Sequence, residues 1–147
     1  MKTLSIAVAI VILAACAAQA RLGETEAEIE KRYGKPKNEL PAIPPSTKLA
    51  CYECGGLKIL VSFINGKSEC EHYWHAVAGT IFRDEMAALL AANSAGMKWE
   101  EESLFYRWRR PDGGVALYCP DDKSLAIFSP AWFAAAGAAR QKNLSGF

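Results

Sequence analysis

The dipeptide Asn65-Gly66 lies between two runs of alternating hydrophobicity, residues 57–64 and 67–75. Both residues tolerate the positive φ of a type I′ turn, which joins two antiparallel strands through only two residues. The sequence therefore predicts a β-hairpin over 57–75, and counting from the turn places Glu71 and His75 on its solvated side. The pairs expected on its apolar side are Val61 with Cys70, Ile59 with His72, and Leu57 with Trp74.

Further strands are predicted on both sides of this hairpin. The runs 48–54, 115–119 and 124–129 are rich in strand-forming residues and end at turn sequences, and 103–110 alternates apolar or aromatic residues with basic ones. Residues 35–47 contain four prolines. They predict a loop, because proline can neither donate to a strand ladder nor continue a helix.

Helices are predicted from their capping residues. Thr25 and Glu28 have the spacing of a capping box, in which each side chain accepts a hydrogen bond from a backbone N–H of the other residue. Ser129-Pro130 has the form of a cap followed by the first residue of a helix. The predicted helices are 25–33 capped by Thr25, 84–93 capped by Asp84, and a short one from Pro130 through Arg140.

Helix, strand, strand, strand thus occurs twice, at a spacing of about sixty residues. One such unit buries too little apolar surface to be stable alone, so two units are expected to share a core. We therefore predict an α+β fold: a tandem repeat of a short helix plus a three-stranded antiparallel sheet, with the helices packed on one face. The predicted domain covers residues 21–129, as repeats 21–76 and 80–129, and a C-terminal short helix and tail follow at 130–147.

The first twenty residues have the layout of an export signal. Lys2 provides a basic start, an apolar run follows from Leu4 to Leu13, and Ala18-Gln19-Ala20 is a small-x-small cleavage signal. The apolar run is shorter than the about twenty residues of a membrane-spanning helix. We therefore expect a signal peptide over residues 1–20 and export from a bacterial cytoplasm, with the mature protein periplasmic or anchored to a membrane by lipid.

The same segment permits a second interpretation. Leu13-Ala14-Ala15-Cys16 resembles the lipobox of bacterial lipoproteins, in which the cysteine becomes the lipidated first residue. Cys16 then anchors the domain to a membrane; otherwise it is a small residue in an ordinary cleavage region. Both interpretations stay open, and contact with a membrane is expected only through this anchor.

The charge balance argues against a nucleic-acid partner. The chain has 17 Lys plus Arg and 16 Asp plus Glu, and Lys2 is the only charge in the export segment, which leaves 16 of each sign. Domains that bind nucleic acid are normally basic. The basic cluster Arg107-Trp108-Arg109-Arg110 is therefore interpreted as a strand with one solvated face, whose arginines discourage pairing at the sheet edge.

Four cysteines follow the export segment: Cys51, Cys54, Cys70 and Cys119. An even number of cysteines in an oxidising compartment predicts up to two disulfides, with three pairings to choose from. Buried free thiols are an alternative. A redox pair of Cys51 and Cys54 is another, although the glycines after it lead into a strand rather than into the helix that such chemistry uses.

A thiol- or zinc-dependent site is the alternative functional hypothesis. Cys51-x2-Cys54-Gly resembles one half of a zinc knuckle, and Cys70 and His72 could supply two further ligands, although their one-residue gap is shorter than the expected second spacing. Cys70 and His72 could also serve as nucleophile and base, but no orienting group accompanies them. The sequence has no phosphate-binding loop, nucleophile elbow or paired helical histidines, so it favours a non-catalytic protein without a cofactor.

Several motifs resemble those of a family of small exported bacterial proteins of uncharacterised function. The order of helices and strands also resembles, more loosely, the tandem fold of the β-lactamase inhibitor protein and the small lipoprotein of the outer-membrane barrel assembly machinery. Both of these act by presenting a surface to another protein, and the resemblance implies the same role here. The motifs are Arg21-Leu22-Gly23-Glu24-Thr25, Arg32-Tyr33-Gly34-Lys35-Pro36, Leu89-Leu90-Ala91-Ala92-Asn93, Lys98-Trp99, Trp108-Arg109-Arg110-Pro111-Asp112-Gly113 and Ala116-Leu117-Tyr118.

These observations together predict an envelope domain that binds another envelope protein. The expected contact surface is a face of the sheet or the loop 35–47. Exposed aromatic side chains are enriched in protein interfaces. The aromatic candidates are Tyr52, Tyr73 and Trp132.

Overall fold

The computed structural model describes residues 21–77, 79–102 and 106–144. The predicted export segment, with Cys16, lies outside these residues, and so do residues 103–105 of the predicted strand 103–110. No helix within the described ranges is long and apolar enough to cross a membrane.

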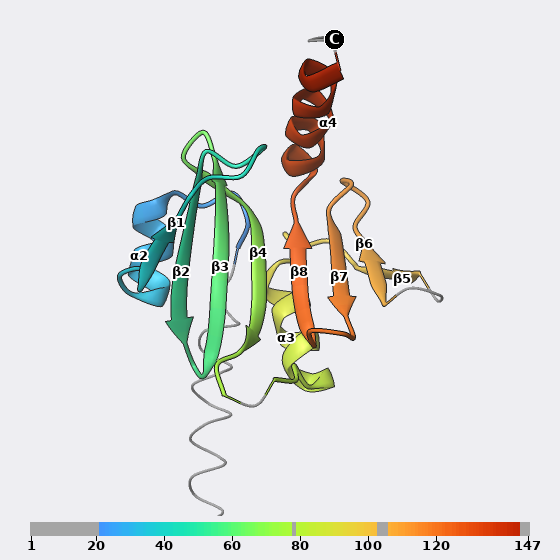
Figure 1. Ribbon diagram of the computed structural model, residues 1–147. Helices are drawn as coiled ribbons and strands as arrows, with labels where there is room; N and C mark the ends of the chain where they lie inside the picture. Colours follow the sequence, from blue (N-terminus) through green and yellow to red (C-terminus); the bar gives the residue numbers. More distant parts are fainter. Residues whose placement is uncertain (1–20, 78, 103–105, 145–147) are drawn as a thin grey trace, which may run out of the picture.

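The described chain forms an antiparallel sheet of eight strands in the order β1-β2-β3-β4-β8-β7-β6-β5. Strands β1 to β4 form one meander and β5 to β8 a second, and the two meanders join where β4 pairs with β8 (Figure 1). The strands are β1 (Asn38–Leu40), β2 (Lys48–Cys54), β3 (Leu57–Ile64), β4 (Lys67–His75), β5 (Glu100–Glu102), β6 (Arg107–Arg109), β7 (Val115–Cys119) and β8 (Ser124–Phe128).

The α+β class with an antiparallel sheet is confirmed, but the sheet is larger than the predicted two sets of three strands. Strand β1 lies inside the predicted loop 35–47, and β5 precedes the predicted strand 103–110. Each has three residues, Asn-Glu-Leu and Glu-Glu-Glu, without an alternating apolar pattern. Only pairing with β2 and β6 makes these segments strands, so local sequence could not reveal them.

The predicted hairpin is confirmed as β3 and β4, and both turn residues, Asn65 and Gly66, have positive φ, 51° and 78°. The predicted register is wrong beyond the first two pairs, because a β-bulge opposite Ser62 and Phe63 makes Glu69 an extra residue in β4. A shift of one residue turns every later side chain to the other face. The observed pairs include Ser62 with Cys70, Leu60 with His72, Lys58 with Trp74, Val61 with Glu71, Ile59 with Tyr73 and Leu57 with His75.

Helix α2 (Glu26–Tyr33) has the predicted capping box. Thr25 N donates to Glu28 Oε2 at 2.7 Å, and Glu28 N donates to Thr25 Oγ1 at 3.4 Å. The helix ends at Gly34, whose φ of 84° is readily adopted only by glycine. Both ends of α2 could thus be predicted from local chemistry.

Helix α3 (Arg83–Ala92) begins one residue earlier than predicted. The carboxylate of Glu85 accepts a hydrogen bond from Phe82 N at 2.8 Å, which satisfies a backbone donor at the helix N-terminus. Asp84 lies in the first turn, where an acidic residue favours the helix dipole. The prediction that Asp84 is the cap is therefore wrong.

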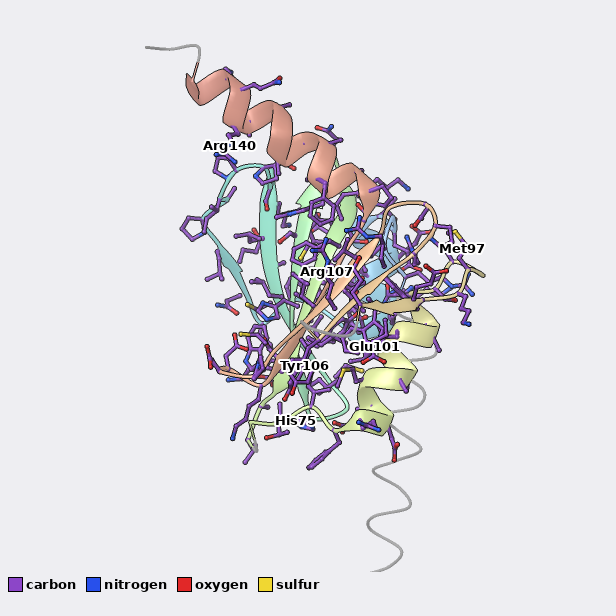
Figure 2. All side chains as sticks on the ribbon, turned by 90° about the vertical axis from the view of Figure 1, so that its right-hand side faces the viewer. His75, Met97, Glu101, Tyr106, Arg107 and Arg140 are labelled. Carbon is purple, nitrogen blue, oxygen red and sulfur yellow. The ribbon has the colours of Figure 1, made fainter. Side chains whose placement is uncertain are left out.

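Helix α4 (Pro130–Leu144) is capped by Ser129 as predicted, since Ser129 Oγ accepts from Trp132 N at 3.1 Å. The rings of Trp132 and Phe133 pack on Phe128, with centroids 5.8 and 5.7 Å away. The rest of the helix extends beyond the end of β8 (Figure 1), and Figure 2 shows it leaning away from the side of the strands on which α3 lies. The prediction that the helices pack on one face therefore does not hold for α4.

One face of the sheet, called the core face below, carries the hydrophobic core. Ile29 of α2 and Leu89 of α3 belong to the same buried cluster as the side chains of this face. Tyr52 and Tyr73 are both 0% exposed there, so the expectation that they present a binding surface is corrected. The strand residues of this core are Ala50, Tyr52, Leu57, Ile59, Val61, Phe63, Tyr73, Ala116, Leu125 and Ile127.

Candidate functional site

The opposite face of the sheet, called the outer face below, carries a row of apolar and aromatic side chains. The strand registers align one residue from each of five adjacent strands, and every member of the row is partly exposed. A solvated sheet face would instead be mostly polar, so such a row is typical of a surface that another molecule covers. The outer row is Cys51, Leu60, His72, Ala126 and Leu117.

A hollow of about 220 Å³ lies beside the outer row. His72 and Trp74 line it from β4, and Ser124 and Asp122 line it from the start of β8 and the turn before. The rings of His72 and Trp74 meet edge to face, with centroids 5.3 Å apart and planes at 68°. The hollow thus has an aromatic wall and a carboxylate wall.

Hydrogen bonds within the hollow determine which of its side chains donate a proton and which accept one. Ser124 Oγ donates to Asp122 Oδ1, and Ser124 N donates to the same oxygen at 3.2 Å. His72 Nε2 lies 2.6 Å from Ser124 Oγ, whose own proton is already given to Asp122, so His72 is the donor in this contact. A nucleophilic serine must donate its proton to the histidine, whereas here the histidine donates to the serine.

The charges of these groups follow from their surroundings. Desolvation lowers the pKa of His72, against a smaller opposing effect of Asp122, so the imidazole is neutral at pH 7. The hydrogen bond from Ser124 lowers the pKa of Asp122, which is therefore ionised. The hollow carries one negative charge and no compensating charge on its histidine.

The structure does not bring the predicted thiol or zinc ligands together. Cys51 and Cys54 are three residues apart on β2 and therefore point to opposite faces. Cys51 and His72 share the outer face but are two strands apart, about 10 Å across the sheet. Cys70 is buried beside Phe128. Within residues 21–77, 79–102 and 106–144, no group of three or more His, Cys, Asp or Glu side chains is placed to hold a metal ion.

Cys51, Cys70 and Cys119 carry free thiols in the structure, and their joining into disulfides stays a prediction. In the reduced protein we expect Cys119, which is exposed, to react with iodoacetamide about tenfold faster than Cys70, because burial raises the pKa of the Cys70 thiol and leaves little thiolate. Peptide mass spectrometry of native and denatured samples measures both rates. Equal rates in the native protein would contradict the burial of Cys70.

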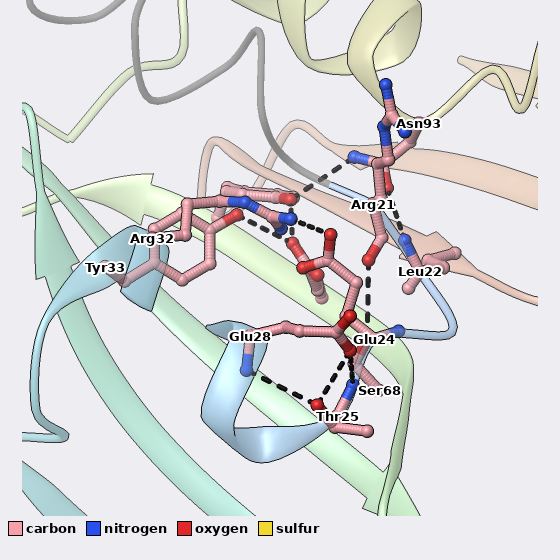
Figure 3. Close-up of polar contacts among 11 residues, drawn as sticks. Arg21, Leu22, Glu24, Thr25, Glu28, Arg32, Tyr33, Ser68 and Asn93 are labelled. Atoms are coloured by element: carbon pink, nitrogen blue, oxygen red, sulfur yellow. Dashed lines mark hydrogen bonds and ion pairs between the residues drawn. The ribbon is translucent and has the colours of Figure 1, made fainter. Parts of the chain in front are cut away.

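A buried polar network packs on the core face of the sheet, between β4, α2 and the end of α3 (Figure 3). Its centre is Glu71, which is 0% exposed although the predicted register places it in solvent. Tyr33 Oη donates to Glu71 Oε2 at 3.0 Å, Tyr73 Oη donates to the same oxygen, and Asn93 Nδ2 donates to Tyr73 Oη at 3.3 Å. Burial raises the pKa of Glu71, and the two tyrosine hydrogen bonds oppose this effect.

Residues 21–24 close this network. Arg32 of α2 pairs with Glu24, and their side chains are only 7% and 19% exposed. Leu22 N donates to Asn93 Oδ1 and Glu24 N donates to Ser68 Oγ, both at 3.1 Å. Residues 21–24 are therefore part of the folded domain and help to hold α2 and α3 against β4.

A second cavity, of about 620 Å³, has the size of a small-molecule site, but two of its three charged lining residues, Arg110 and Glu69, are engaged within the protein. Arg110 donates to Asn93 O and to both carboxylate oxygens of Asp112. Glu69 accepts from Ser129 Oγ. We assign no ligand to this cavity, which is lined by residues 21–23, Glu69, residues 91–96, Arg110, Ser129 and Pro130.

Both edges of the sheet resist the addition of another strand. Strand β1 has three residues and is followed by Pro41, Pro44 and Pro45, and β5 consists of Glu100–Glu102. Short strands, prolines and charged side chains are the means by which sheet edges avoid pairing. Neither edge is therefore suited to pairing with a strand of another molecule.

No protein-family model matches the chain, and neither a curated protein nor a solved structure is significantly similar to it. The fold and the surface alone therefore define the class: an α+β domain with an eight-stranded antiparallel sheet and a partly apolar outer face. The resemblances of the sequence motifs stay predictions.

Of the four residues of the hollow, only His72 was a functional candidate from the sequence, as a possible thiol or zinc ligand. The predicted register assigned His72 and Trp74 to the packed face of the hairpin, and nothing in the sequence gave Asp122 or Ser124 a functional role. The spacing of Asp122 and Ser124 carried a usable signal, because an aspartate often accepts hydrogen bonds from the residue two positions later. Placing the two pairs together required the pairing of β4 with β8, which no local pattern predicts.

Proposed function

We propose that this chain is an exported domain of the bacterial envelope that binds another protein through the outer face of its sheet, without catalysing a reaction. The signal-like segment 1–20, with its alternative lipid anchor at Cys16, supports the location. The observation that carries the proposal is the outer row, which places a partly exposed side chain on each of five adjacent strands, four of them apolar and the fifth the ring of His72.

The remaining surface supports the same assignment. Protected edges leave the faces for contact with a partner, and the core face is filled by the buried cluster. The loop between β1 and β2 adds a further candidate contact, because Ile43 is 67% exposed. Trp132, half-buried at the base of α4, packs on Phe128 of the outer face and extends the aromatic surface.

We also infer that the two halves of the fold are copies of one unit. Helix α2 precedes the meander β1–β4, α3 precedes β5–β8, and the last strands of the two meanders pair with each other. Both helices contribute to one shared core. This inference fits the looser resemblance to the tandem fold of the β-lactamase inhibitor protein, which also presents a surface to another protein.

Charged substitutions on the outer row should weaken partner binding. We expect Leu60→Asp and Leu117→Asp each to reduce the amount of partner captured from native envelope extracts about tenfold, because a carboxylate loses its hydration in an apolar contact. Both positions are partly exposed, so the fold should tolerate the change. The measurement is affinity capture with the tagged, full-length exported protein, followed by quantitative mass spectrometry.

Phe82→Asp is the matched control for this experiment. Phe82 is 60% exposed, precedes α3 away from the outer face, and occupies a helix N-cap, where aspartate is favourable. The control should capture the partner like the wild type. Undiminished capture by Leu60→Asp and Leu117→Asp would count against the outer face as the binding surface.

A further inference from the structure

The hollow beside the outer row combines two features that together recognise a cation. Trp74 presents an aromatic ring, and the ring quadrupole attracts an ammonium or guanidinium group. Asp122 presents a carboxylate across the same hollow, and its hydrogen bonds from Ser124 hold it in place. An aromatic wall and a fixed carboxylate suit a long basic side chain, which has an apolar stem and a charged end.

The hydrogen bonds within the hollow also favour a positively charged side chain. The neutral ring of His72 donates to Ser124, and Ser124 donates to Asp122, so neither of these two side chains points a free proton at an incoming group. A cation meets a negative carboxylate without a positive histidine opposing it. An anionic side chain would meet repulsion from Asp122.

We propose that this hollow is the anchoring subsite of the outer face and that it takes a lysine or arginine side chain of the protein partner. This proposal rests on the proposed function and names the chemistry of the partner: a protein with an exposed basic residue at the centre of its contact surface. Lys58, which faces Trp74 across β3 and β4 on the outer face, is a basic neighbour that competes with the partner side chain for this hollow.

The binding preference can be measured without knowing the partner. In an NMR titration of the full-length exported protein, Nα-acetyl-lysine methylamide should shift the Trp74 indole signal and the amides of residues 122–124 in a saturable manner. Nα-acetyl-norleucine methylamide has the same stem without the charge and should cause much smaller shifts. Equal shifts from both compounds, or none from the lysine compound at tens of millimolar, a range typical of a single side-chain contact, would overturn the proposal.

Two neighbouring aspartates provide a matched pair of variants. Asp122→Asn should weaken binding of the lysine compound about tenfold, because the charge-assisted contact is lost. Asp121→Asn makes the same charge change at an exposed position that does not line the hollow, and should leave the affinity within about twofold of the wild type. Trp74→Leu should abolish the saturable shifts of residues 122–124. Lys58→Gln should strengthen binding of the lysine compound, because it removes the competing ammonium group. Equal weakening by Asp121→Asn and Asp122→Asn would reduce the effect to general surface charge and overturn the proposal.

The affinity-capture experiment, repeated with the hollow variants, distinguishes failure of this proposal from failure of the proposed function. If Leu117→Asp loses the partner while Asp122→Asn captures it like the wild type, the outer face binds the partner but the hollow does not anchor a basic side chain. If neither variant loses the partner, the proposed function fails as well. Loss of the partner in both variants, with Asp121→Asn unaffected, supports both.

Discussion

Replacing Glu71 with alanine should lower the free energy of unfolding by about 3–5 kcal/mol, the range for breaking a buried polar partnership. The change removes the acceptor of the hydroxyl protons of Tyr33 and Tyr73 and leaves both hydroxyls buried. It also opens a cavity at a position that is 0% exposed. Urea unfolding followed by circular dichroism gives the value directly.

Glu71→Gln is the matched control, because it retains the size and a carbonyl acceptor without the ionisable proton. Its cost should be well below that of alanine, and its stability should depend less on pH. Glu53→Ala changes a glutamate on β2 that is exposed to solvent, and should cost under about 1 kcal/mol. A loss for Glu71→Ala no larger than for Glu53→Ala would contradict the buried network.

The sign of the pH effect follows from the direction of the pKa shift. Burial raises the pKa of Glu71 above its ordinary value of 4.5 in the folded state, with Glu24 adding to the shift and Tyr73, Tyr33 and Arg32 opposing it. The folded protein therefore keeps a proton that the unfolded chain releases. The stability from Glu71 is complete below pH 4.5 and is lost as the pH rises through the folded pKa.

The difference in unfolding free energy between wild type and Glu71→Gln, measured as a function of pH, reports the ionisation of Glu71 alone. Carboxylates with lowered pKa, such as Asp112 and Asp122, lose stability in the opposite direction, as the pH falls, but they are present in both proteins and cancel. Unfolding free energies should thus converge or cross as the pH rises from 4 to 8, with the variant gaining on the wild type. A constant difference would contradict the raised pKa.

The second large effect is expected at Arg110, which is 5% exposed and joins two loops to the end of α3. Its guanidinium donates to Asn93 O and to both oxygens of Asp112, and it lies 5.1 Å from the centre of the Trp99 ring. Arg110→Ala should cost about 3 kcal/mol, since it strips a buried carbonyl and a half-buried carboxylate of their donors. Thermal and urea unfolding measure this loss.

Two further variants test this interpretation. Arg109→Ala removes the neighbouring arginine, whose side chain is 49% exposed and pairs with Glu102, and should cost under about 1 kcal/mol. Gly114→Ala would place a Cβ 2.6 Å from Arg110 Nε and should reproduce part of the Arg110→Ala effect by displacing the guanidinium. Equal stability of Arg109→Ala and Arg110→Ala would show that Arg110 is not a structural clamp.

Local chemistry predicted the elements whose signals are contained in a few residues. The capping box of Thr25 and Glu28, the Asn65-Gly66 turn and the cap at Ser129 are all observed where they were expected. Strands β1 and β5 were missed because their three residues take strand form only by pairing with a neighbour. The pairing of β4 with β8, which unites the two meanders, also lies beyond any local pattern.

One bulge residue explains most of the errors at the candidate site. Glu69 adds a residue to β4 that an alternating pattern cannot reveal, and the faces of all later residues exchange. His72 and Trp74 therefore belong to the outer face, whereas Glu71 and Tyr73 lie in the core. The prediction that a sheet face forms the contact surface stays a prediction, and it now refers to a definite face.

Site-specific photo-crosslinking in intact cells tests the central claim most directly. The photoreactive residue benzoylphenylalanine would replace Leu60 or Leu117 on the outer row, or Lys31, an exposed residue of α2, as the control. A discrete crosslinked protein is expected from positions 60 and 117 and none from position 31. Crosslinks to a partner from position 31 alone, or equal yields from all three positions, would contradict the assignment of the outer face.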